Sequence, residues 1–404
     1  MKAAEIVNLL NNYLPGHSLE QAFYTSEEIF HFDRELIWKK YWLFAGVTAE
    51  IPKEGDYITY AVGRDSVIII RGREGKVHAH FNTCRHRGST ICQDEKGHAP
   101  KLMCPYHQWV YNSDGSLFKA RLMPDDFDRA SYGLHPVHLR LIEGLIFISL
   151  AEEPVDFEPV VRDLAPYVKT YQVDQSKVAF KKSYTIRTNW KLIAENFREC
   201  YHCGPAHPEY CKAVVGANLR ESIDDILLER RAAWKSKGLV TEGVDFETDT
   251  FHFATRYPLR DGVESYSLDG KAVAIPMGAH KDLDAGVVGL VCYPNFWMDA
   301  VGDYVWTMRI TAESASQCRI DLTWLVDGKA EEGKDYNVER LTEFWKITGE
   351  QDWKLCENNF NGIESSRYQP GPYAPVELEV AKFVEWYVER LREGVEATST
   401  VELP

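Results

Sequence analysis

The sequence has few basic residues for its size and no long uninterrupted apolar stretch. Lys and Arg total 46 against 61 Asp and Glu, which gives a net charge of −15. Nucleic-acid phosphates are bound by clustered positive charge, so this balance argues against a nucleic-acid-binding protein. No apolar run reaches the ~20 residues of a membrane helix, and the opening MKAAEIVNLLNNYLPGHS lacks the basic start and apolar core of a secretory signal. We therefore expect a soluble, cytoplasmic protein.

Nucleotide-binding motifs and a disulfide framework are also missing. Neither G-x-G-x-x-G nor a P-loop occurs, so the sequence gives no sign of a cradle for a nicotinamide cofactor or a phosphate group. The nine cysteines are an odd number scattered over 404 residues, unlike those of a small disulfide-stabilised domain. We expect reduced thiols, some of them metal ligands.

Three segments differ in the spacing of their apolar residues. Residues 1–41 carry apolar positions at helical spacing, which predicts an N-terminal helical segment packing with the larger domain. Residues 42–152 alternate β-branched and polar residues between glycine-containing turns, which predicts a small β-rich domain. This β-rich domain would be inserted before the third segment, 153–404.

The third segment mixes helical and strand-like patterns after the acidic, proline-bearing link EEPVDFEP. The spacing predicts helices and strands over the following residues: helices at about 189–203, 334–360 and 376–393, and strands within 289–300, 303–314 and 318–327. The fold class we expect is α+β, with an antiparallel sheet covered by helices in the larger domain.

Two short loops in the β-rich domain each combine one Cys with one His. Cys84-x-His86 is followed after seventeen residues by Cys104-x-x-His107. A structural zinc site uses this ligand set, and so does a Rieske-type [2Fe–2S] cluster, with two Cys on one iron and two His on the other. Spacing alone does not decide between zinc and iron, although one Cys and one His per loop suits a cluster held from both sides. Unrelated loop residues are the third interpretation.

A second group of possible ligands follows the predicted 189–203 helix. Glu195, Glu199 and His202 are spaced to share one helical face, Pro205 ends or turns the helix, and His207 follows. Two His and one carboxylate form the facial triad of non-haem Fe(II) oxygenases. The alternative is a pair of polar histidines at a helix end. The carboxylate must come from later in the chain, and the acidic candidates are Asp299, Asp303, Asp352 and Glu357.

Both groups resemble the metal sites of Rieske non-haem iron oxygenase α subunits, and together they extend the resemblance to nearly the whole chain. Cys84-x-His86 and Cys104-x-x-His107, with Trp109 and YNSDGSLF behind them, are similar to the Rieske signature. NWKLIAENFRECYHCGPAHPEY is similar to the mononuclear-iron segment. The first resemblance implies a [2Fe–2S] cluster on the two Cys–His pairs. Because Cys92 and His98 break the pairing, we expect neither to be a ligand.

The second resemblance implies a mononuclear Fe(II) on His202 and His207. It also implies that Glu199 links the two centres, by hydrogen bonds to His202 and to the cluster ligand His107 of a neighbouring subunit. The stretch EQDWKLCENNFNGIESSRYQPGPY resembles the C-terminal ligand helix of the family, with Asp352 at the ligand position and Glu357 as the second choice.

The same resemblance implies the cosubstrates and the partners. O2 would be activated at the iron, and electrons would come from NAD(P)H through a separate flavin and iron–sulfur reductase. A homotrimer follows from a bridge that crosses subunits. No nucleic acid or membrane is expected among the partners.

The substrate class is suggested by the residue at the bridge position. Many ring-hydroxylating relatives carry Asp there, whereas Glu199 within ECYHC resembles the branch that oxidises quaternary ammonium compounds such as glycine betaine and proline betaine. In that branch an N-methyl group is hydroxylated and formaldehyde is released. Aromatic ring hydroxylation, and an iron–sulfur electron-transfer protein without oxygenase activity, are the alternative functions.

Aromatic residues late in the chain offer a binding site for such a substrate. A trimethylammonium group favours aromatic faces, each contributing about 0.5–2 kcal/mol. The second domain offers Tyr304 and Trp306 and, earlier, a run in which strand alternation would place Tyr293, Asn295 and Trp297 on one face and Phe296 on the other. Packing in the core is the alternative role for these aromatics.

Overall fold

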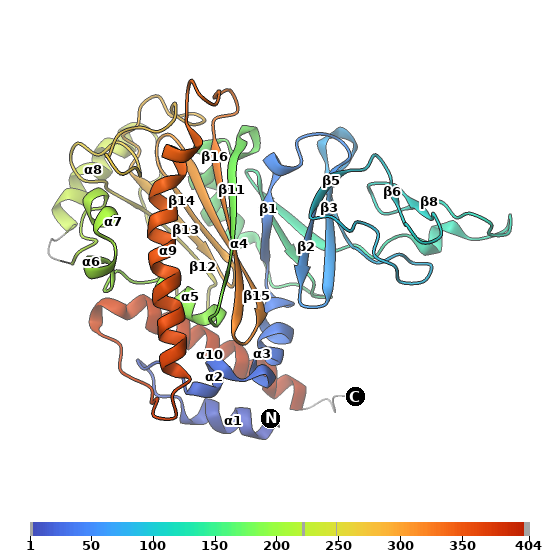
Figure 1. The fold of residues 1–404 in the computed structure, drawn as a ribbon, viewed down its shortest axis with the longest axis horizontal. Helices are drawn as coiled ribbons and strands as arrows, with labels where there is room; N and C mark the ends of the chain where they lie inside the picture. The colour runs from blue at the N-terminus through green and yellow to red at the C-terminus, as the bar shows by residue number, and fades with distance from the viewer. Residues whose placement is uncertain (1–2, 220–222, 248, 400–404) are drawn as a thin grey trace.

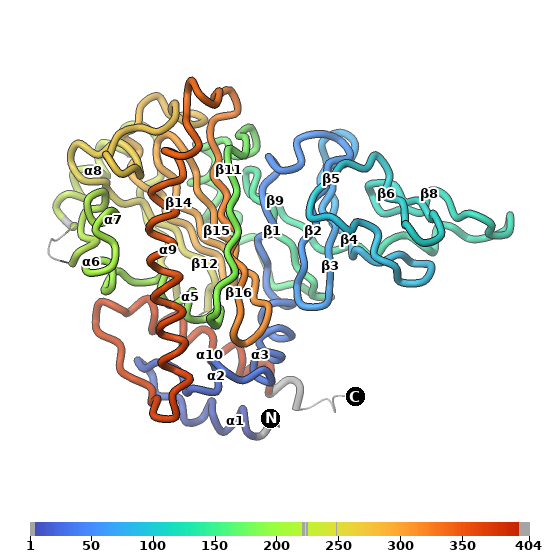
Figure 2. Tube along the Cα trace, in the orientation of Figure 1, coloured from blue at the N-terminus to red at the C-terminus, as the bar shows by residue number. Residues whose placement is uncertain are grey.

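The structure is a computed structural model that describes residues 3–219, 223–247 and 249–399. A broad part is built around a large sheet, and a narrower arm extends from it (Figure 1). Figure 2 traces the chain from the N-terminal helices into the arm and back into the broad part, where the last helix returns to the first ones. No helix among the described residues is both long and apolar enough to cross a membrane.

The N-terminal helices pack against the end of the chain. They are α1 (Ala3–Asn12), α2 (Gln21–Thr25), α3 (Glu27–Asp33) and the π-helical turn Arg34–Trp38, and they meet α10 (Leu378–Ser399). Asp33 holds this contact together because its buried carboxylate accepts hydrogen bonds from Lys191 Nζ at 2.6 Å and Tyr387 Oη at 2.7 Å. A buried charge needs such partners. The hydrogen bonds of Asp33 therefore hold α3, the segment around Lys191 and α10 in fixed positions relative to one another.

The arm consists of three small antiparallel sheets. They contain β1 (Leu43–Val47), β10 (Leu145–Ser149) and β9 (His138–Ile142); β4 (Val77–Phe81), β3 (Asp65–Arg71), β2 (Asp56–Val62) and β5 (Lys96–His98); and β6 (Leu102–Met103), β7 (Val110–Tyr111) and β8 (Leu117–Lys119). The first sheet shares the main hydrophobic core, whereas the tip of the arm has a core of its own around Cys84, Cys104 and Trp109.

The broad part contains a six-stranded sheet in which every pair is antiparallel. Its order is β11 (Lys177–Ile186), β16 (Gln317–Val326), β15 (Val305–Ser314), β14 (Phe296–Ala300), β13 (Val287–Cys292) and β12 (His252–Tyr257). Together with the covering helices, this sheet confirms the predicted fold class.

Helices line the sheet on the side where the second group of ligands lies. The long helix α9 (Val338–Ile363) crosses the sheet in Figure 1 and contacts β11, α5 (Trp190–Asn196) and α7 (Pro208–Ala213). Asn337 caps α9 by accepting the backbone N–H of Arg340 at 3.1 Å. The remaining helices are α4 (Glu158–Val168), α6 (Cys203–Ala206) and α8 (Asp224–Ser236), with 3-10 turns at Thr48–Glu50, Arg73–Gly75, Arg129–Tyr132, Lys169–Tyr171, Val173–Gln175 and Pro375–Glu377.

Two predicted elements end earlier than the sequence suggested. The helix expected over 189–203 stops at Asn196, so the prediction that Glu195, Glu199 and His202 share one helical face is wrong. The strand expected through residues 289–300 is a hairpin, because the turn 293–295 separates β13 from β14. Strand alternation therefore does not apply across this turn.

Candidate active site

The two Cys–His loops lie at the tip of the arm. The backbone of each loop closes on itself: Gly88 N–H donates to Cys84 O at 2.9 Å, and Gln108 N–H donates to Cys104 O at 3.1 Å. Both cysteines are buried and His86 is exposed. The imidazole rings of His86 and His107 lie 4.6 Å apart between centroids. Thiols inside and imidazoles outside match a cluster with one inner and one outer iron.

Atoms left without partners in these loops fit such a cluster. His107 Nδ1 is buried and has no hydrogen-bond partner, which is costly unless another group occupies its lone pair. Cys84 Sγ lies 3.2 Å from Tyr111 Oη, a hydrogen bond that a thiolate sulfur can accept. His98 instead pairs with Asp56 at 2.8 Å, and Cys92 sits in the core of the tip. Neither of these two residues belongs to the Cys–His loops.

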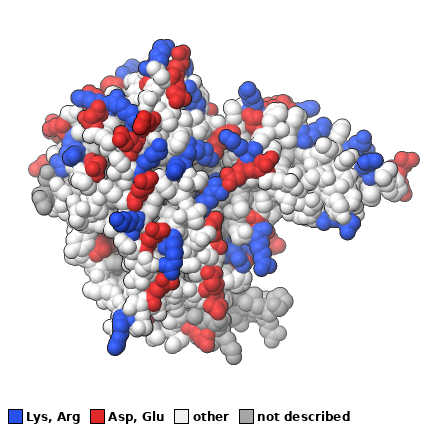
Figure 3. All heavy atoms as spheres, in the orientation of Figure 1, with Lys and Arg blue, Asp and Glu red and all other residues white. Residues whose placement is uncertain are grey.

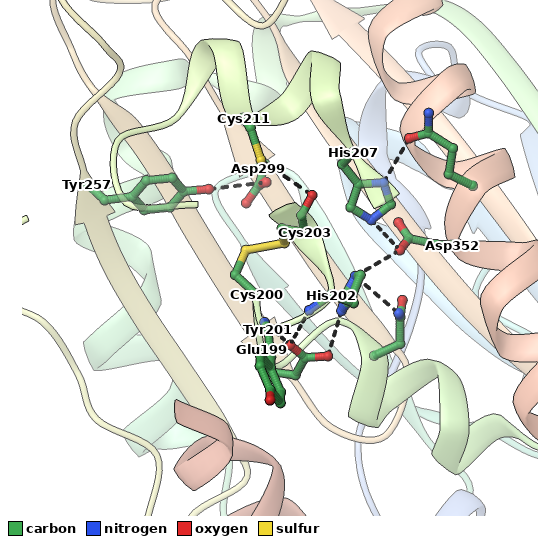
Figure 4. The surroundings of a disulfide bond; sticks show 12 residues. Glu199, Cys200, Tyr201, His202, Cys203, His207, Cys211, Tyr257, Asp299 and Asp352 are labelled. Atoms are coloured by element: carbon green, nitrogen blue, oxygen red, sulfur yellow. Dashed lines mark hydrogen bonds and ion pairs between the residues drawn. A yellow bond between two sulfur atoms is a disulfide. The ribbon is translucent and has the colours of Figure 1, made fainter. Parts of the chain in front are cut away.

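The second group brings His202, His207 and Asp352 together from two distant parts of the chain. Their ligand atoms all lie within 4.8 Å of one another. His207 Nε2 is 2.9 Å, and His202 Nε2 is 3.3 Å, from the same Asp352 oxygen, Oδ1. Figure 4 shows both rings turned toward this carboxylate. Two Nε2 atoms and one carboxylate oxygen form a donor set suited to a divalent iron.

Each imidazole of this triad is oriented by a further acceptor. His202 Nδ1 lies 2.5 Å from Glu199 Oε1, and His207 Nδ1 lies 2.8 Å from Gln351 Oε1. With Nδ1–H donating to these oxygens, Nε2 is the ring nitrogen of each histidine that would face a bound metal. Sequence reasoning missed Gln351. Its place directly before Asp352 on α9 could have suggested a role beside the triad, although no motif spacing points to Gln351.

A turn, rather than a helix, presents Glu199 and His202. α5 ends at Asn196, and the Glu199 carboxylate accepts the backbone N–H of Tyr201 and, at 3.2 Å, that of His202. The side chain therefore caps the turn that carries His202. His207 follows α6 and directly precedes Pro208, the first residue of α7.

The field at the triad is negative. Burial alone would lower the pKa of His202, but its hydrogen bonds to Asp352 and Glu199 outweigh burial and raise the pKa to about 9. For His207, burial is likewise outweighed by Asp352, and the pKa is raised. A site that favours a positive charge on imidazole also favours a metal cation.

A cavity of about 180 Å³ opens beside the triad. His202, His207 and Asp352 form one part of its lining. Aromatic side chains and a further acid form much of the rest: Phe197, Tyr210, Phe253, Tyr257, Trp297, Asp299, Trp306 and Trp345. The cavity wall therefore combines aromatic rings and carboxylates with one cation, Arg198, and it ends at the candidate metal ligands.

The other predicted site residues lie elsewhere or serve the fold. Asp303 is fully buried and accepts from Ser265 Oγ at 2.7 Å and from Val273 N at 2.8 Å. Glu357 accepts the backbone N–H of Arg187 at 3.2 Å. Neither carboxylate is in the group with the two histidines.

Of the predicted aromatic face, only Trp297 reaches the cavity. Tyr293 is in the turn and packs on Phe383 with 4.8 Å between ring centroids. Asn295 bonds the backbone N–H and C=O of Phe44 at 2.8 and 3.0 Å, which ties the hairpin to the arm. The strand periodicity failed here because a turn sits where a continuous strand was expected.

Two cysteines next to His202 differ from the expectation of reduced thiols. Cys200 and Cys203 form a disulfide on either side of Tyr201 and His202, and Figure 4 shows it beside the triad. The other seven cysteines are free. The prediction of thiols throughout is therefore wrong for this pair, which the turn after α5 brings together.

Comparison with family models gives two matches that together span most of the chain. Residues 41–132 match the Rieske [2Fe-2S] domain, and residues 173–393 match the ring hydroxylating alpha subunit (catalytic domain). The first match favours the iron–sulfur interpretation of the loops over zinc. The second assigns the sheet and its helices to a catalytic domain, so the chain is more than an electron-transfer domain.

Several curated proteins are similar to the chain along most of its length. The glycine betaine monooxygenase oxygenase subunit of Pseudomonas aeruginosa (strain UCBPP-PA14) is 40% identical over 383 residues, covering 93% of this chain and 89% of the relative. The subunit of the same name from Chromohalobacter salexigens is 36% identical over 402 residues, covering 96% and 89%.

Solved structures share the fold. A crystal structure of the quaternary ammonium Rieske monooxygenase CntA in complex with an inhibitor superposes with a TM-score of 0.74 at 21% identity, covering 95% of this chain and 98% of that one. The arrangement of arm, sheet and long helix is thus one already seen in experimental structures.

Proposed function

The chain belongs to the family of Rieske oxygenase α subunits, and on that premise we propose that it hydroxylates an N-methyl group of a quaternary ammonium compound such as glycine betaine. The chain is an oxygenase with a Rieske [2Fe–2S] domain and a non-haem iron catalytic domain. The observation that carries the substrate class is the cavity, whose aromatic and acidic wall ends at the triad of His202, His207 and Asp352. The names of its relatives from Pseudomonas and Chromohalobacter agree with this substrate class.

We assign the cluster to Cys84, His86, Cys104 and His107, and the mononuclear iron to His202, His207 and Asp352. When bound, the cluster supplies single electrons and the iron supplies O2 activation. The protein's own part is to hold the two imidazoles in one tautomer through Glu199 and Gln351 and to exclude water from the reacting methyl group.

The overall reaction balances with two electrons. The N-methyl group of the quaternary ammonium substrate, O2, two electrons and two protons give an N-hydroxymethyl group and water. The resulting carbinol then loses formaldehyde and a proton, leaving the tertiary amine. The electrons come from NAD(P)H through a separate flavin and iron–sulfur reductase, because the sequence carries neither nucleotide-binding motif.

We further propose that the working assembly is a homotrimer in which one subunit's arm delivers electrons to the next. Figure 1 shows the tip of the arm at the opposite end of the molecule from α6 and α7. In the first Cys–His loop, Arg85 and Arg87 stand on either side of His86, and Figure 3 shows basic side chains along the arm with acidic ones at its far end. Glu195, Glu199 and Glu377 line a surface hollow beside His202. The basic loop around His86 and the acidic hollow are complementary.

The test is a single turnover with chemically reduced, iron-replete protein and O2. Glycine betaine, proline betaine, carnitine and choline are compared with aromatic acids, and formaldehyde and hydroxylated ring products are measured. Formaldehyde from a betaine, in proportion to the cluster oxidised, is the expected result. A hydroxylated ring product without formaldehyde would keep both metal sites and overturn the substrate class.

A further inference from the structure

Two charged side chains in the cavity wall have no part in the reaction as described above. Asp299 lies on β14, where it pairs with Gly289 of β13 on one side and Trp306 of β15 on the other. Arg198 lies in the turn after α5. Both line the same cavity as the candidate iron ligands.

Asp299 is a carboxylate with too few partners. A Cβ atom on Gly289 would come within 3.3 Å of Asp299 Oδ1, so the missing side chain leaves space in front of this carboxylate. The hydroxyl of Tyr257 donates a long hydrogen bond to Asp299 Oδ2, at 3.5 Å. Burial raises the pKa of Asp299 to about 7, although the hydrogen bond from Tyr257 lowers this pKa. An ionised carboxylate here needs a cation to compensate its burial.

Aromatic faces lie next to Asp299. Trp306, its strand neighbour, stacks on Trp345 with 4.2 Å between ring centroids and 7° between planes. Tyr210 lines the same part of the cavity, with its ring 6.2 Å from that of Trp345. A carboxylate among aromatic rings is suited to a trimethylammonium group, which has no N–H and is held by charge and by ring faces.

Arg198 is a buried cation with an unused donor. Its side chain is 4% exposed and pairs through Nη2 with Glu379 at 2.6 Å. The guanidinium lies over the ring of Phe253, 4.5 Å from the centroid. Its Nε–H is buried without an acceptor. A buried donor without a partner is rare and costs stability unless a ligand accepts from it.

We propose that the cavity binds a zwitterionic betaine in one direction, with the ammonium beside Asp299 and the carboxylate accepting from Arg198. The proposal rests on the quaternary ammonium function given above and adds the two residues that set the orientation of the bound betaine. Opposite charges at separate places in one cavity select a ligand that carries both. Ligands with only one charge lose one of the two contacts.

Three probes of similar shape separate the two contacts. Glycine betaine carries both charges, choline keeps the ammonium but replaces the carboxylate with an alcohol, and 3,3-dimethylbutanoate keeps the carboxylate but replaces the ammonium with a neutral tert-butyl group. Dissociation constants are measured by calorimetry on oxidised, iron-replete protein, so that no turnover occurs.

The variants are Asp299→Asn and Arg198→Lys. We expect Asp299→Asn to weaken glycine betaine and choline by about tenfold or more while changing 3,3-dimethylbutanoate less than about twofold. Arg198→Lys keeps the charge opposite Glu379 but removes the Nε donor, so it should weaken glycine betaine and 3,3-dimethylbutanoate and spare choline. Asp282→Asn, at a surface ion pair with Lys237, is the control for loss of one charge.

Each outcome separates the two proposals. If Asp299→Asn weakens all three probes equally, or changes none of them, the proposed orientation of the betaine is wrong. Formaldehyde release by the unmodified protein would still support the proposed function. Failure of the unmodified protein to release formaldehyde from any of the four quaternary ammonium compounds overturns the proposed function itself. Iron content and melting temperature are recorded for every variant, and Tyr257→Phe, which removes the hydrogen bond to Asp299, provides a second test in case Asp299→Asn does not fold.

Discussion

Single side chains around the triad divide into those placed to bind a metal and those that orient the binding groups. Asp352 offers one oxygen to both histidines, whereas Glu199 and Gln351 hold the opposite ring nitrogens. Asp352 is therefore the side chain whose loss removes a ligand atom outright. Loss of an orienting partner typically lowers metal affinity or activity by about 10–100-fold.

We expect Asp352→Ala to lower mononuclear iron affinity by at least about 100-fold while leaving the cluster in place, because a lost ligand costs more than a lost orienting group. Iron per chain and the visible absorbance of the cluster are the measurements. Glu357→Gln, a carboxylate change on the same helix, is the matched control and should leave iron unchanged. Full iron occupancy in Asp352→Ala would move the third ligand elsewhere.

At the scale of elements, the hairpin of β13 and β14 and the strand pair β15–β16 join the catalytic sheet to the arm. Asn295 in the hairpin turn bonds Phe44 of β1 on both backbone atoms, and its Nδ2 also lies 3.1 Å from Tyr60 Oη. On the neighbouring strands, Asp321 accepts from Arg309, whose Nη1 donates to Ala45 O of β1. Buried polar groups thus position the arm on the sheet.

Asn295→Ala should lower the free energy of unfolding by about 2–4 kcal/mol, because it leaves the buried N–H and C=O of Phe44 without partners. Since Asn295 does not line the cavity, the affinity for glycine betaine should stay within about twofold of the original. Urea unfolding and calorimetry measure the two effects. Asn358→Ala, at an exposed position of α9, is the control. If Asn295→Ala is stable but binds glycine betaine more weakly, Asn295 belongs to the substrate site after all.

Asp321 should make stability depend on pH. Burial alone would raise its pKa, but Arg309 at 2.7 Å, the hydrogen bond from Ser183 at 2.6 Å and Arg319 at 3.0 Å outweigh burial and lower the pKa to about 2. Because the folded value is below the unfolded value of about 3.9, the stabilisation is present above pH ~4 and is lost as pH falls toward 2.

Asp321→Asn should therefore cost about 2–3 kcal/mol at pH 7. The difference from the unmodified protein should shrink by about half at pH 3, where the unfolded carboxyl is already mostly protonated. Denaturant unfolding at both pH values is the measurement. A difference that is the same at pH 7 and pH 3 would contradict the assigned shift.

At the scale of the whole molecule, the tip of the arm lies at the opposite end from α6 and α7, the two helices that flank His207 (Figures 1 and 2). A short electron path within one chain does not fit this arrangement. His86 and Arg87 are exposed at the tip, and Glu199 lines a surface hollow near His202. Contact between subunits brings these two surfaces together in the proposed trimer.

Mixed oligomers test this arrangement. His107→Ala should lose the cluster, and Glu199→Gln should keep both metals but lose turnover by about 100-fold. Neither variant is active alone, but co-assembled chains should recover part of the activity, because an intact cluster on one chain then faces an intact Glu199 on another. Size-exclusion chromatography with light scattering gives the oligomeric state. Mixtures that stay inactive although they co-assemble would place the path within one chain.

The sequence by itself determined the features that depend on local spacing. Cys84 and His86, Cys104 and His107, and His202 and His207 are each separated by a few residues, so one turn brings each pair together whatever the rest of the chain does. The fold class followed from periodicity in the same way, and the resemblance to known oxygenases gave Asp352 its place before the structure did.

Only the tertiary structure decided how distant segments meet. It ended α5 at Asn196, placed residues 293–295 in a turn and joined Asp352 to the histidines through the packing of α9 on α7. It also set Asp299 and Trp306 side by side through strand register. Register and helix packing are fixed by the burial of many side chains at once, so the spacing of a single segment does not contain them.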